Sequence, residues 1–190
     1  MSVVWLTGPI GSGKSTLAEA LRGALAPIAP IAILDGDAVR TAVGDDLGYS
    51  GADRLVQSAR LGRIARLLAT QKHVVVVADS CSDPDRLAWN RANLPGYVEV
   101  FLKASLEKLT RRDLRGVYAR AKAGQWSNVV GIDIPWHEPA LPDVTFDMDD
   151  PEPPEVLALR IAVLIPEFVA AATATAHNVP ARRFAPTRQP

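Results

Sequence analysis

The chain has 190 residues, of which 48% are hydrophobic and 22% charged, so its length and composition predict one globular domain with a sizeable core. Its 21 basic residues balance 21 acidic ones, which leaves no global field to attract nucleic acid or an anionic membrane. The single cysteine, Cys81, excludes a disulfide framework and a cysteine-based zinc site. The longest apolar run, Val74 to Ala78, is far too short to span a membrane. We therefore expect a cytoplasmic protein with neither a nucleic-acid nor a membrane partner.

Short apolar, β-branched segments alternate along the chain with segments of helical periodicity, which predicts buried strands connected by helices. Right-handed connections of this kind give a parallel sheet that is covered by helices on both faces. In chain order, we first predict a strand at 3–7, a helix from about residue 13 to Pro27, a strand at 31–34 and an acidic turn at 35–37. A helix at 52–71, a strand at 74–78, a helix at 83–93 and a strand at 97–102 follow. The last predicted elements are a helix at 105–112, a basic stretch at 111–122, a strand at 144–146 and one closing helix at 154–173.

The first predicted strand leads directly into GPIGSGKST, residues 8–16, a full match to the phosphate-binding pattern G-x-x-x-x-G-K-[ST]. The glycines let backbone N–H groups turn inward around phosphates, Lys14 can span the terminal two phosphates, and the Ser15 hydroxyl can bind Mg²⁺. Because the motif follows a buried strand and opens a helix, it predicts binding of a nucleoside triphosphate with magnesium. The residues assigned to the nucleotide are Gly8, Gly11, Ser12, Gly13, Lys14, Ser15 and Thr16.

The remaining sequence narrows the type of nucleotide-binding protein. No N-K-x-D string is present to read a guanine base, and the chain is short for a motor or an AAA-type ATPase. A phosphate loop at the start of a short domain is typical of a nucleotide or metabolite kinase. We therefore predict a P-loop NTPase fold of three α/β/α layers with a mostly parallel sheet, and ATP and Mg²⁺ as cofactors.

An acidic segment, LDGDAVR at residues 34–40, follows the second predicted strand. In a doubly wound sheet such a segment lies at the carboxyl edge of the strands, where ligands bind. Asp35 and Asp37 could there orient an acceptor hydroxyl, accept its proton and support Mg²⁺, while arginines hold an anionic substrate. The alternative makes Asp35 a helix cap and Asp37 a solvated turn residue, and composition alone favours neither.

Several strings occur in the order and spacing found in the adenylyl-sulfate kinases, and on them the chain resembles that family over about residues 3–149. They are LDGDAVR, DLGYSGADR at residues 46–54, RRDLRGVYARAKAG at residues 111–124 and GIDIPWHEP at residues 131–139. The resemblance implies transfer of a phosphoryl group from Mg-ATP to the 3′-hydroxyl of adenylyl sulfate. It also implies a mobile lid over about residues 111–135 that closes on ATP and excludes water.

The resemblance also implies the role of individual residues. Asp35 becomes the base or hydroxyl-orienting carboxylate and acts with Lys14, while Asp37 assists through the magnesium shell beside Ser15. Tyr49 stands where the family has a phenylalanine that stacks on the acceptor's adenine. The residues so assigned to the acceptor are Asp37, Arg40, Tyr49, Arg54, Gln57, Arg120 and Val129, and those assigned to ATP in the lid are Arg111 and Arg112.

Departures from the family pattern are concentrated around the acceptor. Ala38 replaces an asparagine, the run Gln57-Ser58-Ala59-Arg60 replaces N-[IV]-R-R, and Val129 replaces a lid phenylalanine. The segment DSCSDPDR, residues 79–86, carries an extra acidic residue. Losing one stacking face costs about 1–3 kcal/mol per base, and losing a charge-assisted contact costs a comparable amount. From these losses we expect adenylyl sulfate, if it is used, to be a weak acceptor.

Three interpretations therefore stay open: an adenylyl-sulfate kinase, a related kinase for another nucleotide-linked or anionic alcohol, and a non-catalytic nucleotide-binding module. The last is disfavoured, because a pure binder has no need of the acidic segment. We expect a kinase domain at residues 1–175 and a Pro/Arg-rich tail at residues 176–190 without periodic pattern. The expected partner is a small nucleotide or anionic acceptor. A homodimer is the oligomeric state to test.

Overall fold

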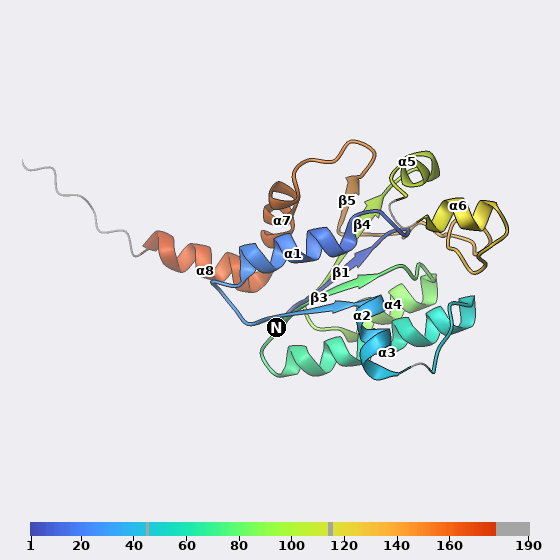
Figure 1. The fold of residues 1–190 in the computed structure, drawn as a ribbon. Coiled ribbons are helices and arrows are strands. Elements are labelled where there is room, and N and C mark those ends of the chain that lie inside the picture. Colours follow the sequence, from blue (N-terminus) through green and yellow to red (C-terminus); the bar gives the residue numbers. More distant parts are fainter. Residues whose placement is uncertain (45, 114–115, 178–190) are drawn as a thin grey trace, which may run out of the picture.

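A five-stranded parallel sheet forms the centre of the computed structural model, which describes residues 1–44, 46–113 and 116–177 (Figure 1). The strand order is β2-β3-β1-β4-β5, so the strand that precedes the phosphate loop is central. The strands are β1 Val3–Thr7, β2 Ile31–Asp35, β3 Val74–Asp79, β4 Tyr97–Lys103 and β5 Val144–Asp147. All five predicted strands are confirmed. Four of them extend one residue further, to a polar residue that an apolar pattern cannot include.

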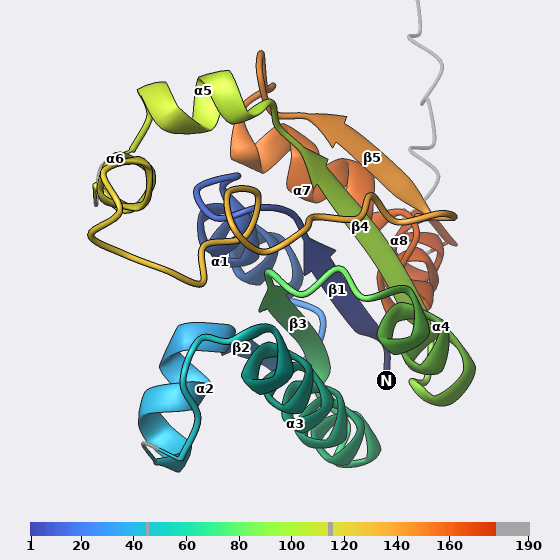
Figure 2. The ribbon, with the colours of Figure 1, turned by 90° about the vertical axis from the view of Figure 1, so that its right-hand side faces the viewer.

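Helices cover both faces of the sheet and one of its ends. The helices are α1 Lys14–Leu25, α2 Gly36–Val43, α3 Gly51–Thr70, α4 Pro84–Asn93, α5 Leu106–Arg111, α6 Val117–Lys122, α7 Pro154–Ala162 and α8 Pro166–His177. Helices α1, α7 and α8 lie on one face, and α3 and α4 on the other (Figures 1 and 2). The carboxyl ends of the strands point toward α2, α5 and α6 (Figure 1).

Alternation along β1 shows how the two faces are filled. Val4 and Leu6 belong to the core beneath α1 and α7, whereas Val3 and Trp5 belong to the core beneath α3 and α4. Because successive side chains of a strand point to opposite faces, a strand buried on both faces is apolar throughout. The predicted three-layer fold is thereby confirmed.

The prediction of one closing helix over residues 154–173 was wrong. Two helices, α7 and α8, occupy this region and meet at a bend of 85°. Pro166 is the first residue of α8, and proline suits a first helical position because its missing N–H would be unpaired there. Inside a continuous helix the same ring would clash with the preceding turn. The proline therefore divides the segment.

Two short helices were absent from the sequence prediction. The expected acidic turn at residues 35–37 is the start of α2, and the basic stretch contains α6. Both helices are too short to show a clear periodicity, because they span only about two turns. Helix α8 ends at His177, so residues 176 and 177, assigned to the tail, are helical. Residues 178–190 lie outside the described residues.

Within the described residues, no individual helix is both long and apolar enough to cross a membrane. The pair α7 and α8 meets the length and composition requirements only when its two bent halves are joined.

Candidate active site

The phosphate loop connects β1 to α1 and depends on its glycines. Gly11 and Gly13 have φ values of 81° and 98°, a left-handed region that side chains with a Cβ rarely adopt. A Cβ on Gly8 would lie 2.7 Å from the carbonyl oxygen of Leu102, so β4 leaves room only for glycine there. No described side chain caps α1. Its first N–H groups therefore face the loop, where an anion is stabilised.

Lys14 is buried and turns its ammonium group into the loop. Nζ donates hydrogen bonds to the carbonyl oxygens of Gly8 and Pro9, each at 2.8 Å. Burial lowers the pKa of Lys14 to about 8, although the nearby carboxylates of Asp79 and Asp35 oppose this shift. The amine thus lies on the inner side of the loop, where phosphate oxygens can replace the two carbonyls.

Asp35 joins the acidic segment to the phosphate loop. Its interpretation as a helix cap is confirmed, and its role toward the acceptor stays a prediction. Its Oδ1 accepts hydrogen bonds from the backbone N–H groups of Asp37 and Ala38, at 3.0 and 3.4 Å, as the N-cap of α2. Its Oδ2 accepts the Ser15 hydroxyl at 2.7 Å. One carboxylate therefore fixes the start of α2 and also contacts the hydroxyl assigned to magnesium. Asp37 is exposed in the first turn of α2.

Three residues assigned to the acceptor come together beside α2. The Tyr49 ring, whose residue is 51% exposed, contacts the guanidinium groups of Arg40 and Arg54 at 4.7 and 5.7 Å from its centroid. Arg54 also donates to the carbonyl oxygen of Tyr49 at 3.1 Å and to that of Asn128 at 2.9 Å. Two cations thus converge on one aromatic ring, and one of them contacts the predicted lid.

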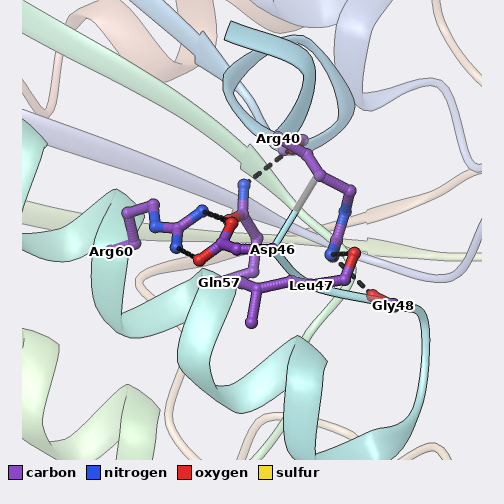
Figure 3. A network of polar contacts seen from close by, with 7 residues as sticks. Arg40, Asp46, Leu47, Gly48, Gln57 and Arg60 are labelled. Carbon is purple, nitrogen blue, oxygen red and sulfur yellow. Dashed lines mark hydrogen bonds and ion pairs between the residues drawn. The ribbon is translucent and has the colours of Figure 1, made fainter. Parts of the chain in front are cut away.

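A polar network holds the loop before α3 in place (Figure 3). Arg40 donates to the carbonyl oxygens of Leu47 and Gly48 at 3.2 and 2.6 Å, and Arg60 forms an ion pair with Asp46 at 2.5 Å. Arg60 also donates to Gln57 Oε1 at 3.3 Å. In Figure 3 the Arg60 side chain contacts Asp46 from α3, while Arg40 approaches this loop from α2.

Gln57 is buried and donates through Nε2 to the carbonyl oxygen of Gly36 at 2.9 Å. This bond ties the first turn of α2, which follows Asp35, to helix α3. A direct contact between Gln57 and the acceptor stays a prediction.

The predicted lid packs on the phosphate loop through one tyrosine. Tyr118 is buried and donates its hydroxyl to the carbonyl oxygen of Ile10 at 2.7 Å. Val129, 3% exposed, packs in the same cluster with Leu109 and Tyr118. The Val129 side chain therefore faces the interior of this cluster, and its role toward the acceptor stays a prediction.

Three basic residues of the lid region, Arg111, Arg112 and Arg120, are exposed. Arg111 pairs with Glu107 at 2.6 Å, Arg112 donates to the carbonyl oxygen of Asp149 at 3.5 Å, and the Arg120 guanidinium lies 5.0 Å from the centre of the Trp126 ring. Helices α5 and α6 lie on one side of the phosphate loop and α2 on the other (Figure 2). A contact of Arg111 and Arg112 with ATP, and of Arg120 with the acceptor, stays a prediction.

Sequence reasoning missed one buried carboxylate at this edge of the sheet. Asp79 ends β3, and its Oδ2 accepts the Ser58 hydroxyl at 2.6 Å. Burial raises the pKa of Asp79, although its hydrogen bonds with Ser58 and Cys81 and the charge of Lys14 oppose the shift. The signal in the sequence was a carboxylate directly after the apolar run Val74 to Ala78, but only its departure from the family pattern was noticed.

Cys81, the single cysteine of the sequence, is buried, and its surroundings give a prediction about its reactivity. Burial raises the pKa of the Cys81 thiol to about 11, so at pH 8 it is almost entirely protonated, and the thiolate is the reactive form. We expect iodoacetamide to modify the native protein roughly 100-fold more slowly than the protein unfolded in guanidinium, the scale set by the difference in thiolate fraction. The rates are measured by mass spectrometry at pH 8, and equal rates would contradict the burial and raised pKa of the Cys81 thiol.

Together, a P-loop between β1 and α1, a carboxylate at the end of β2 and a cluster of arginines beside it define a P-loop kinase. A family model described as adenylylsulphate kinase matches residues 1–147. The chain belongs to the adenylyl-sulfate kinase family.

Known proteins of this family are similar over most of their length. The chain is 42% identical to an adenylyl-sulfate kinase from Myxococcus xanthus, over 77% of this chain and 82% of that protein. It is 41% identical to one from Chloroflexus aurantiacus, over 85% and 88% of the two chains. Its structure is similar to that of the Mycobacterium tuberculosis APS kinase CysC in complex with AMPPNP and APS. That match has a TM-score of 0.79 and 34% identity, and covers 86% of this chain and 96% of the other.

Proposed function

We propose that this protein uses Mg-ATP to phosphorylate the 3′-hydroxyl of adenylyl sulfate. The observation that carries the proposal is the contact of Asp35 with Ser15 at 2.7 Å, because it joins the phosphate loop to the acidic segment beside the acceptor residues. The similarity to adenylyl-sulfate kinases along 1–147 supports the same acceptor. A cytoplasmic location is part of the proposal, since ATP is supplied there.

The residues that the chain provides suit phosphoryl transfer by positioning and charge. Lys14 and the N-terminus of α1 bind the phosphates of ATP. Asp35, fixed by the hydrogen bonds it receives from the α2 backbone, orients the acceptor hydroxyl and accepts its proton. Arg40 and Arg54 hold the sulfate and phosphate end of the acceptor.

The donor set at this edge fits magnesium. Ser15 contributes a hydroxyl oxygen, and Asp35 and Asp37 contribute carboxylate oxygens, the hard oxygen ligands that Mg²⁺ prefers. Among the described residues, no group of three or more His, Cys, Asp or Glu side chains forms a complete metal site. This agrees with the usual behaviour of Mg²⁺ in kinases, which binds through one or two protein oxygens, waters and the nucleotide. When bound, the ion would neutralise charge on the transferred phosphoryl group.

The proposal is tested by incubating the purified protein with Mg-ATP and adenylyl sulfate and following both ADP and the 3′-phosphorylated product. Parallel reactions contain other nucleotides and nucleotide-linked or anionic alcohols. Equal amounts of ADP and phosphoadenylyl sulfate are expected. Phosphorylation of a different acceptor, with none of adenylyl sulfate, would show that the departures at Ala38 and Val129 had changed the substrate. Binding of ATP without turnover of any acceptor would favour the non-catalytic module.

Tyr49 gives a prediction about the base of the acceptor. Tyr49→Ala removes the exposed aromatic ring that lies against Arg40 and Arg54, and base stacking on an aromatic side chain contributes about 1–3 kcal/mol. We therefore expect kcat/KM for adenylyl sulfate to fall about 10- to 100-fold, while the affinity for ATP stays nearly unchanged. Tyr49→Phe, which keeps the ring and loses only the hydroxyl, is the matched control. An unchanged kcat/KM in Tyr49→Ala would exclude a stacking role.

A further inference from the structure

A buried polar pair connects α3 to β3 beneath the acceptor residues. The Ser58 hydroxyl donates to Asp79 Oδ2 at 2.6 Å, and the two residues are 1% and 7% exposed. The same two elements otherwise pack through apolar side chains such as Leu61 and Val77. A carboxylate buried in this way costs free energy unless neighbouring charges and hydrogen bonds compensate it. Compensating charges are therefore expected close to the Asp79 carboxylate.

The sheet topology puts Asp79 between the two substrate regions. In the parallel register, Asp79 is opposite Thr7, the last residue of β1 before the phosphate loop. On the other side, its neighbour Ala78 is opposite Asp35 at the end of β2. The remaining oxygen of Asp79 accepts the backbone N–H of Cys81 at 3.1 Å. The carboxylate is thus held at both oxygens, directly between the ATP loop and the acidic segment.

The charges around Asp79 belong to both substrate regions. Lys14, on the ATP side, and Arg54, on the acceptor side, both interact electrostatically with the Asp79 carboxylate. Arg86, which stacks on Trp89 and bonds to Asn90, is a third cation in its field. Burial raises the pKa of Asp79, while its hydrogen bonds with Ser58 and Cys81 and the charge of Lys14 oppose this shift and favour the ionised carboxylate.

We propose that Asp79 is a fixed counter-charge shared by the two anion-binding regions, which limits how tightly each binds its anionic ligand. The carboxylate offsets part of the positive charge that Lys14 and Arg54 present to phosphate and sulfate groups. It touches neither substrate in this role and acts through the two cations, as a positioning residue. The inference rests on the proposed function only in that ATP and an anionic acceptor occupy these two regions.

Asp79→Asn tests the charge while preserving the shape and the hydrogen-bonding capacity of the side chain. With Asp79 neutral, we expect the Kd for a non-hydrolysable ATP analogue with Mg²⁺, measured by calorimetry, to fall roughly tenfold, the scale of one screened charge interaction inside a protein. The KM for the acceptor should fall in the same direction. If Asp79 has only a structural role, Asp79→Asn should lower the melting temperature and leave the affinity for the analogue unchanged or weaker.

Two control variants separate charge from packing. Ser58→Ala removes the hydrogen bond and leaves the carboxylate, so it should lower the melting temperature without tightening the binding of the analogue. Glu99→Gln neutralises another buried carboxylate, which lies in β4 and bonds to Tyr97 at 3.0 Å, before the end of the strand that faces the site. We expect this variant to leave the Kd of the analogue unchanged.

The outcomes distinguish the inference from the function on which it rests. Wild-type protein that does not bind the analogue would contradict the proposed function. Wild-type binding with an equal or weaker affinity in Asp79→Asn would overturn only the counter-charge role. If Asp79→Asn does not fold, the double variant Ser58→Ala, Asp79→Val decides, because an apolar pair of similar volume often replaces a buried polar pair without loss of stability. Tighter binding in the double variant supports the inference, and unchanged or weaker binding overturns it.

Discussion

Replacement of Lys14 by alanine is expected to lower kcat by at least about 10²–10³-fold, the usual cost of removing one preorganised electrostatic contact to a transition state. The reason is that the Lys14 ammonium faces the interior of the phosphate loop, where it can span the β- and γ-phosphates. Steady-state kinetics with Mg-ATP and adenylyl sulfate measure the loss. Circular dichroism should show an intact fold, since the lysine bonds only to carbonyl oxygens of the loop.

The matched control is Lys72→Ala, because Lys72 is an exposed lysine in the turn before β3, outside the phosphate loop. Its kinetic constants should equal those of the wild type. Near-normal turnover in Lys14→Ala would contradict the assignment of the loop to ATP.

Asp35→Asn is expected to lower turnover by about 100-fold or more, the scale for removal of a general base. The amide keeps the shape of the side chain, and its oxygen can still accept the N–H groups of Asp37 and Ala38 as a cap. It loses the negative charge that faces the Ser15 hydroxyl and the acceptor. The Kd for ATP should therefore change little, while kcat falls. Calorimetry measures the Kd for ATP, and steady-state kinetics measures the loss of kcat.

Two further variants separate catalysis from capping. Asp35→Ala loses the cap as well and should be less stable by about 1 kcal/mol, in addition to its loss of turnover. Asp83→Asn changes another N-cap aspartate, which accepts the backbone N–H of Arg86 at 2.9 Å at the start of α4, and should keep normal turnover. If Asp35→Asn turned over like Asp83→Asn, the carboxylate would be only a helix cap.

The agreement between predicted and observed strands has a physical basis. A strand buried on both faces of a parallel sheet is apolar at every position, so runs such as Val74 to Ala78 are visible without any knowledge of their neighbours. The division between α7 and α8 also has a local signal, Pro166. It was missed because the apolar pattern continues on both sides of the proline. The short helices α2 and α6 were missed because about two turns contain too few residues for a periodic signal.

The candidate site was predictable where its residues are adjacent in sequence. The phosphate loop is one continuous string, and its chemistry follows from the residue types alone. The roles of Arg40, Tyr49 and Arg54 came from the resemblance to a family. The structure adds that these three side chains lie together and that Val129 packs with Leu109 and Tyr118.

The sequence by itself determined the class of fold, the nucleotide loop and the family. Each of these depends on residues that are close together in the chain: apolar strand segments, the glycines of the loop and short motifs. Only the tertiary structure decided that Asp35 contacts Ser15, that Ser58 contacts Asp79 and that Tyr118 bonds to the loop at Ile10. These partners are 20, 21 and 108 residues apart. Such contacts depend on the β2-β3-β1-β4-β5 order of the sheet, and a local pattern of apolar and polar residues does not encode which strands become neighbours.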